Sequence, residues 1–301
     1  MNFIYISVLV IVLALASTIY ERVIHHRHVK PKWLYRLHYA AIIGGCYIII
    51  QIYNPAAFLT AAAAVLSLVR IYDLIRNHYA PRTGEIALIT EFSRDMTVFV
   101  IIFWAFRTFI FDYSPIPSGS MEPTLLAGDL ISINKMAYQV KIPPFGKPLY
   151  RFSSPKRGEV VVFNSPLDPH TFYIKRVIAV GGDKVEYKNK QYFVNGTPYV
   201  QTEKQLDYTS APGGKQWLTT ANENTDGIIH QIQLNNSFGP DLVYDVPEGH
   251  LFVSGDNRDF SFDSRMFGPI SEDLIVGRAT HILTHFQLPT LVSFSRTHKL
   301  T

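Results

Sequence analysis

The chain has 301 residues, of which 48% are hydrophobic, and its mean hydropathy is +0.10. This length allows a membrane segment together with one or two compact domains. The formal net charge is +4, but the basic residues of the first third flank apolar segments, which argues for membrane orientation and against nucleic-acid binding. The sole cysteine is Cys46, so an intrachain disulfide and a cysteine metal site are excluded.

The N-terminal third, residues 1–111, is predicted to be a membrane domain. Residues 2–20 carry no charge and are long enough for one span. The positive charges, beginning with Arg22 and Arg27, follow this segment, whereas a cleaved leader would have them in front. The positive-inside rule therefore places the N-terminus outside and the basic loop in the cytoplasm.

A second apolar stretch, residues 37–75, is interrupted by Asn54-Pro55. That dipeptide is a turn signal, so two short spans at about 37–53 and 56–75 are favoured over one long span. A re-entrant or interfacial hairpin over the same residues is the alternative. A last span is predicted at 96–111, with Arg107 near its outer end. Four crossings place the chain after residue 112 outside the cytoplasm.

Residues 112–301 predict a mainly β, antiparallel, extracytoplasmic domain. Residues 130–133 alternate between apolar and small polar side chains, and 159–164 (EVVVFN) and 251–254 are short apolar runs. Few helical periods appear between them, which favours strands over helices.

Two further features lie in the middle of this domain. Asn195-Gly196 stands between Tyr-Phe-Val and Thr-Pro-Tyr and predicts a two-residue hairpin turn. The polar segment at about 201–245 is interpreted as an insertion or a second small β region, and we expect it to be dispensable for chemistry.

A serine and a lysine stand out as candidate catalytic residues. Ser120 lies in the sequence SGSM, and Lys175 lies in the strand-like sequence YIKR. A serine hydroxyl needs a neighbouring base, and a lysine can serve once burial has lowered its pKa, by up to about 3–5 units. Strand alternation places the next residue, Arg176, on the opposite face, where we expect it to be solvated.

The segment 116–124 (IPSGSMEPT) resembles the nucleophile box of the bacterial type I signal peptidases. Further blocks match that family in the same order and cover most of residues 112–280. These blocks are Gly128-Asp129, residues 158–163 continuing into 173–185 (YIKRVIAVGGDKV), and residues 255–265 (GDNRDFSFDSR). The N-terminal third and about 200–245 resemble nothing specific.

The resemblance implies a role for each matching residue. Ser120 would be the nucleophile and Lys175 the general base, while Ser118 and the Ser120 N–H would form the oxyanion hole. Ser261 would orient the lysine amine. The resemblance also implies a structural ion pair between Asp263 and Arg265. It further implies a supporting turn beneath the site, formed by Gly255, Asp256 and Asn257.

The implied reaction is removal of signal peptides from secreted preproteins after small residues, of the Ala-x-Ala type, through an acyl-enzyme and without a cofactor or metal. The implied partners are preproteins and the lipid bilayer of a bacterial inner membrane, with the domain on the periplasmic side. No nucleic acid and no obligate protein partner are expected. The residues expected to line the substrate pockets are Ile116, Pro117, Met121, Leu125, Tyr173 and Ile174.

Three other functions are weighed against this one. A catalytically inactive, membrane-anchored scaffold of the same fold would show loss of Ser120 or Lys175, and both are present. Self-cleaving repressor peptidases share the serine–lysine chemistry but are soluble and bind DNA. A histidine-based hydrolase would leave the lysine block unexplained. The histidines available for it, none in a recognisable motif, are His170, His230, His250, His281 and His285.

Overall fold

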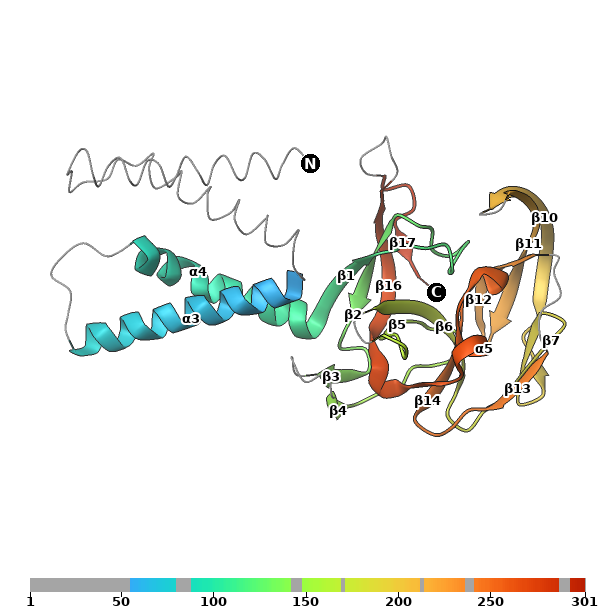
Figure 1. The fold of residues 1–301 in the computed structure, drawn as a ribbon, viewed down its shortest axis with the longest axis horizontal. Coiled ribbons are helices and arrows are strands. Elements are labelled where there is room, and N and C mark those ends of the chain that lie inside the picture. Colours follow the sequence, from blue (N-terminus) through green and yellow to red (C-terminus); the bar gives the residue numbers. More distant parts are fainter. Residues whose placement is uncertain are drawn as a thin grey trace. The chain divides into compact units, whose positions relative to one another are not determined.

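The computed structural model describes residues 55–79, 88–141, 148–168, 171–211, 214–235, 241–286 and 293–300. The chain divides into two compact units, Met1–Phe106 and Arg107–Thr301. The first unit contributes two described helices and the second contributes the strands (Figure 1).

The described helices of the first unit are α3, Pro55–Tyr79, and α4, Leu88–Ala105. Proline is favoured at the first position of a helix, where its missing N–H costs nothing, so the Asn54-Pro55 signal coincides with the start of α3. Hydrogen bonds join the helices. Thr97 Oγ1 donates to the Leu66 carbonyl at 3.3 Å, and Trp104 Nε1 donates to Thr60 Oγ1 at 3.0 Å.

The described residues include two of the four predicted membrane spans. The spans at 2–20 and 37–53 lie outside the described residues. Residues 56–75 are helical in α3, and most of 96–111 is helical in α4 and in the π-helical turn η2, Phe106–Ile110. No helix in the described part of the chain is long and apolar enough to cross a membrane. The spans at 56–75 and 96–111 stay predictions.

The second unit is built around an eight-stranded sheet in the order β1-β2-β16-β5-β6-β14-β15, with β17 paired to β16. Every pair in it is antiparallel, which confirms the mainly β, antiparallel prediction. Its strands are β1 Phe111–Pro115, β2 Asp129–Asn134, β5 Val160–Asn164, β6 Phe172–Val180, β14 His250–Ser254, β15 Ile270–Ser271, β16 Ile275–His285 and β17 His298–Lys299.

The apolar run of β5 is unbroken because this central strand is buried on both faces. Val160 and Val162 pack into one hydrophobic cluster, while Val161 and Phe163 pack into another. Successive side chains of a strand point to opposite faces, so four consecutive apolar residues serve two cores. The neighbouring strand β6 then carries Lys175 opposite Val161 in the ladder.

Smaller sheets complete this unit. β7 Lys184–Lys188, β8 Gln191–Val194, β9 Thr197–Pro198 and β13 Leu242–Asp245 form a four-stranded sheet, and β3 Gln139–Lys141 pairs with β4 Pro148–Arg151. Between β8 and β9, Asn195 and Gly196 both have positive φ, 52° and 79°. A two-residue turn of type I′ needs positive φ at both positions, and β8 pairs antiparallel with β9, which confirms the predicted hairpin.

Most of the segment 201–245 forms a three-stranded sheet of its own, named here the small sheet. Its strands are β10 Gln201–Ala211, β11 Gly214–Thr225 and β12 Ile228–Asn235. The small sheet meets the loop after β14, where the Gln233 N–H donates to the Asp256 carbonyl at 2.8 Å. That loop contains the short helices η3, Arg258–Phe260, and α5, Ser264–Phe267; η4, Glu272–Leu274, follows β15.

Candidate active site

Ser120 lies in the turn that joins β1 to β2. The turn is closed at its base because Ile116 N–H donates to the Asp129 carbonyl at 2.8 Å and Gly128 N–H donates to the Ile116 carbonyl at 2.9 Å. Met121, directly after the serine, is buried in a hydrophobic cluster. The serine is therefore held between a hydrogen-bonded base and an apolar anchor.

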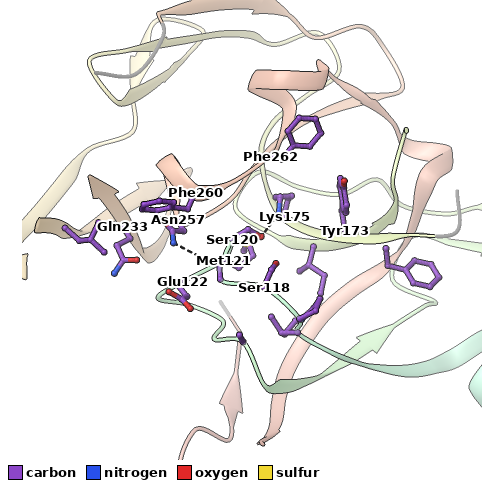
Figure 2. A pocket seen from close by; sticks show the side chains of 17 residues that line it. Ser118, Ser120, Met121, Glu122, Tyr173, Lys175, Gln233, Asn257, Phe260 and Phe262 are labelled. Carbon is purple, nitrogen blue, oxygen red and sulfur yellow. Dashed lines mark hydrogen bonds between the residues drawn. The ribbon is translucent and has the colours of Figure 1, made fainter. Parts of the chain in front are cut away.

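Lys175 reaches Ser120 from β6. Its Nζ donates a hydrogen bond of 2.7 Å to Ser120 Oγ (Figure 2), and the residue is only 4% exposed. Burial lowers the pKa of Lys175 to about 8, although Asp263 and Asp256 act in the opposite direction. Removal from water disfavours the charged ammonium, so this lysine is neutral far more often than a surface lysine.

Arg176 corrects one expectation. It was expected to be solvated on the opposite face of the strand, but it is 0% exposed. Its Nε and Nη2 donate to the two carboxylate oxygens of Asp256 at 2.9 and 2.8 Å, and its Nη1 donates to the Gly158 carbonyl at 2.7 Å. A buried guanidinium needs such a paired partner, and a single sequence gave no sign of where this partner was.

Asp256 also fastens the chain just after the nucleophile. Thr124 Oγ1 donates to Asp256 Oδ2 at 2.5 Å. Burial alone would raise the pKa of Asp256, but the Arg176 guanidinium, together with His230 and the hydrogen bond from Thr124, lowers that pKa to about 2. The carboxylate therefore stays ionised and joins β6 to the nucleophile turn.

Asn257 and Gly255 hold the backbone of the nucleophile. Asn257 Nδ2 donates to the Gly119 carbonyl at 3.1 Å, and Asn257 N–H donates to the Ser120 carbonyl at 3.2 Å. At Gly255, a Cβ atom would overlap the Ser120 carbonyl and the Ser261 side chain. Glycine is thus required there by close packing.

Asp263 and Arg265 form an ion pair beside the lysine. Arg265 Nε and Nη2 donate to the two carboxylate oxygens of Asp263 at 2.9 and 2.8 Å. Gly255 N–H also donates to Asp263, at 2.9 Å. Burial raises the pKa of Asp263, but hydrogen bonding and charge from Arg265 prevail and lower it. Arg265 thus pairs with the Asp263 carboxylate, which would otherwise lie unpaired near Lys175.

Unlike the residues described above, the proposed oxyanion donors and Ser261 are not held by hydrogen bonds of their own within the described part of the chain. Among the described residues, neither the Ser118 hydroxyl nor the Ser120 N–H donates a hydrogen bond. The Ser261 hydroxyl is buried and makes no hydrogen bond of normal geometry in the described chain, although it lies close enough to Asp263 to help lower the pKa of that carboxyl. A hydrogen bond from Ser261 to Lys175 is therefore not formed in this structure.

A cavity of about 690 Å³ opens at Ser120 and Lys175. Leu125, expected to line the pockets, does not line it, because its side chain is 0% exposed within the hydrophobic cluster. The other residues expected there do line it: Ile116, Pro117, Met121, Tyr173 and Ile174.

Several lining residues were not foreseen. The lining residues inside the matching blocks could have been predicted, because they lie near Ser120, Lys175 or Ser261 in sequence. Leu218 and Gln233, in contrast, come from the small sheet. Nothing in a polar segment without a motif signals that it folds against a catalytic loop. The unforeseen lining residues are Glu122, Ala127, Phe172, Leu218, Gln233, Phe260 and Phe262.

Histidines take no part in this cavity within the described chain, and His170 lies outside the described residues. His230 is buried, and burial lowers its pKa to about 4. His285 contacts the Asp129 carboxylate at 2.8 Å. A histidine-based hydrolase therefore finds no support at this site. No group of three or more metal-ligating side chains that could hold an ion occurs in the described ranges.

Comparisons with known proteins find relatives of this chain. Residues 89–284 match the family described as signal peptidase, peptidase S26. The chain is 32% identical to a signal peptidase I of Pseudomonas fluorescens over 272 residues, covering 79% of this chain and 94% of the relative. It is 34% identical to the Pseudomonas aeruginosa signal peptidase I over 226 residues, covering 69% and 78%.

A solved structure, the signal peptidase I of Enterococcus faecalis, is 25% identical, covers 42% of this chain and 97% of its own, and has a TM-score of 0.27. The family assignment depends on the sequence matches, which extend over most of both chains. The chain therefore belongs to the signal peptidase I family, peptidase family S26, and is a serine peptidase by that membership.

Proposed function

We propose that this chain removes N-terminal signal peptides from secreted preproteins by a serine–lysine mechanism, with Ser120 as nucleophile and Lys175 as general base. The observation that carries the proposal is the 2.7 Å hydrogen bond between Lys175 Nζ and Ser120 Oγ inside a cavity. Nucleophile and base must lie within such a distance for proton transfer.

The first step is acylation of the serine. Neutral Lys175 Nζ accepts the Ser120 proton while Oγ bonds to the carbonyl carbon of the scissile peptide. The resulting oxyanion accepts hydrogen bonds from the Ser118 hydroxyl and the Ser120 N–H, both free for this role in the described chain. Donors of this kind contribute about 2.7–4 kcal/mol each.

The oxyanion then collapses, the carbon–nitrogen bond breaks, and the Lys175 ammonium gives its proton to the leaving amine. The mature protein departs, and the signal peptide remains as an ester on Ser120. Lys175, neutral again, accepts a proton from water as the hydroxide oxygen attacks the ester. It then returns that proton to Ser120 Oγ.

Ser261 supports the lysine in this cycle. Its hydroxyl is buried without a hydrogen-bond partner among the described residues, and an unpartnered buried hydroxyl is costly. We assign it the task of accepting a hydrogen bond from the Lys175 amine when that amine is not bonded to Ser120. Gly255, Asp256, Asn257, Asp263 and Arg265 keep the loop in place.

The substrate is an extended peptide with small residues, of the Ala-x-Ala type, before the scissile bond. The apolar wall of β6, with Tyr173 and Ile174, suits short apolar side chains, and extended peptides commonly bind by β-addition. Residues 112–301 form the catalytic part in this proposal. They work at the periplasmic surface of a bacterial inner membrane, where the apolar part of a signal peptide partitions, and residues 1–111 hold them there.

The test uses the full chain purified in detergent and a preprotein with one Ala-x-Ala site. Wild type is compared with Ser120→Ala and Lys175→Ala, and mass spectrometry locates the cut. Cleavage at that site by wild type alone supports both activity and mechanism. Cleavage that survives either substitution rejects the mechanism. A folded wild type that cuts nothing supports the inactive scaffold instead.

A further inference from the structure

The cavity has two different walls on either side of Ser120. One wall comes from β6 and is apolar, with Phe172, Tyr173 and Ile174. The other comes from the small sheet, the loop after β14 and Glu122 of the nucleophile turn. Figure 2 shows Gln233, Asn257 and Phe260 on one side of Ser120, with Tyr173 on the other. The residues of this second wall, named here the distal wall, are Glu122, Leu218, Gln233, Asn257 and Phe260.

An extended substrate has to pass both walls. Successive residues of an extended chain advance by about 3.3 Å, so residues on the two sides of the scissile bond occupy different parts of a cavity of about 690 Å³. Since the β6 wall takes the residues before the bond in the proposed function, the residues after it leave along the distal wall.

Glu122 brings a negative charge to that wall. Its carboxylate is folded back over the nucleophile turn, because a Cβ built on Gly119 would lie 2.7 Å from Glu122 Oε1. Among the described residues, no cation lies within 4.0 Å of this carboxylate and no hydrogen bond reaches it. Partial burial raises the pKa of Glu122, and the nearby Arg296 only partly opposes this.

Arg296 makes its hydrogen bonds with groups other than Glu122. Its Nη2 donates to Asp129 Oδ2 at 3.2 Å and to the Thr124 carbonyl at 3.3 Å. The Glu122 carboxylate therefore faces the cavity with its acceptor capacity unused. An acceptor-only group in such a place attracts donors, above all cationic ones.

Gln233 adds a second unused acceptor on the distal wall. Its Oε1 is buried and has no hydrogen-bond partner in the described chain. Its backbone is fixed, since Gln233 N–H donates to the Asp256 carbonyl at 2.8 Å. A buried amide oxygen without a partner costs free energy unless a ligand completes it.

We infer that the distal wall binds the first two residues after the scissile bond, and that Glu122 makes it favour a lysine or arginine side chain there over a neutral or acidic one. This inference rests on the proposed function and deepens it, because it gives the small sheet and Glu122 a part in substrate choice. Gln233 Oε1 accepts a hydrogen bond from the same stretch of the substrate.

The experiment measures a ratio of rates for matched substrates. Preproteins identical up to the scissile bond carry lysine, glutamine or glutamate at the first or second position after it. For wild type we expect kcat/KM to fall in the order lysine, glutamine, glutamate at one of these positions. The expected step between lysine and glutamine is about fivefold at low salt, the upper range for a partly exposed ion pair, and it shrinks as salt is added.

Glu122→Gln removes the charge and is expected to bring the lysine-to-glutamine ratio close to one, whatever its overall rate. Glu248→Gln is the matched control, because Glu248 is exposed and does not line the cavity, and it should keep the wild-type ratio. Equal rates for all substrates with wild type, or an unchanged ratio in Glu122→Gln, overturn the inference and leave the proposed function standing. Absence of any cleavage by wild type defeats the proposed function itself.

Discussion

The eight-stranded sheet and the small sheet both reach the candidate active site, but they contribute different things. The larger sheet positions Ser120 and Lys175, which do the proposed chemistry. The small sheet supplies no reacting group and contributes part of a cavity wall, Leu218 and Gln233. The contrast shows that a segment without any recognisable motif can be as closely built into a site as the motifs themselves.

A buried ion pair fastens the small sheet to the catalytic loop. Glu223, on β11, receives hydrogen bonds from both terminal nitrogens of Arg258 in η3, and both residues are almost fully buried. His230, on β12, lies 3.5 Å from an oxygen of Asp256 and 3.7 Å from one of Glu223. The expectation that residues 201–245 are dispensable for chemistry is hard to reconcile with these contacts.

The largest expected effect belongs to the larger sheet. Lys175→Arg is expected to lower kcat about a thousandfold or more, because arginine cannot be deprotonated in a protein and general-base catalysis contributes 10²–10⁴. Cleavage kinetics of a preprotein measure it. Lys188→Arg is the control, since Lys188 is exposed, and it should retain wild-type rates. Substantial turnover by Lys175→Arg would remove this lysine as the base.

Breaking the ion pair between the small sheet and the catalytic loop should lower the stability of the protein. Glu223→Gln leaves Arg258 buried without a counter-charge, which typically costs 3–5 kcal/mol. Denaturant unfolding of the variant should show a loss of about that size, while Glu203→Gln, an exposed change on neighbouring β10, should stay within about 0.5 kcal/mol. A loss confined to activity, with unchanged stability, would contradict the anchoring role of the pair.

The pH dependence of cleavage tests Lys175, which lies on β6 of the larger sheet. The reactive form of Lys175 is neutral and its pKa is lowered to about 8 by burial, so kcat/KM should rise about tenfold per pH unit below 8 and level off above it. The sign follows from the base: each proton bound to Nζ removes the acceptor for the Ser120 proton. A kcat/KM that is flat between pH 6 and 8 would exclude lysine as the titrating base.

Sequence and structure agree best where local pattern decides the outcome. The alternating and apolar runs around β2, β5 and β14 and the Asn195-Gly196 turn were predictable because their periodicity and turn chemistry are local. The proximity of Ser120 to Lys175 could be predicted only through the family blocks. Their distance of 2.7 Å depends on a turn and a strand 55 residues apart.

The remaining features depend on tertiary packing that no local pattern encodes. Arg176 can be buried because Asp256, 80 residues later, accepts hydrogen bonds from its Nε and Nη2. Leu125 was expected in the pocket because it lies near Ser120 in sequence, but it points into the core. Residues 56–75 and 96–111 were predicted as spans from their apolar content. The first range and most of the second are helical, and no described helix is long and apolar enough to cross a membrane.

The smallest expected effect tests whether the small sheet contacts the substrate or only encloses the cavity. Gln233→Leu removes a buried acceptor that has no partner in the described chain, so it should cost little or no stability. If Gln233 Oε1 accepts a hydrogen bond from the substrate after the scissile bond, KM should rise about fivefold, the equivalent of one net hydrogen bond. A substrate with a simple amide or ester leaving group, and so no residue after that bond, should show no such rise. Equal effects on both substrates would mean that the small sheet encloses the cavity without contacting the residues that leave along it.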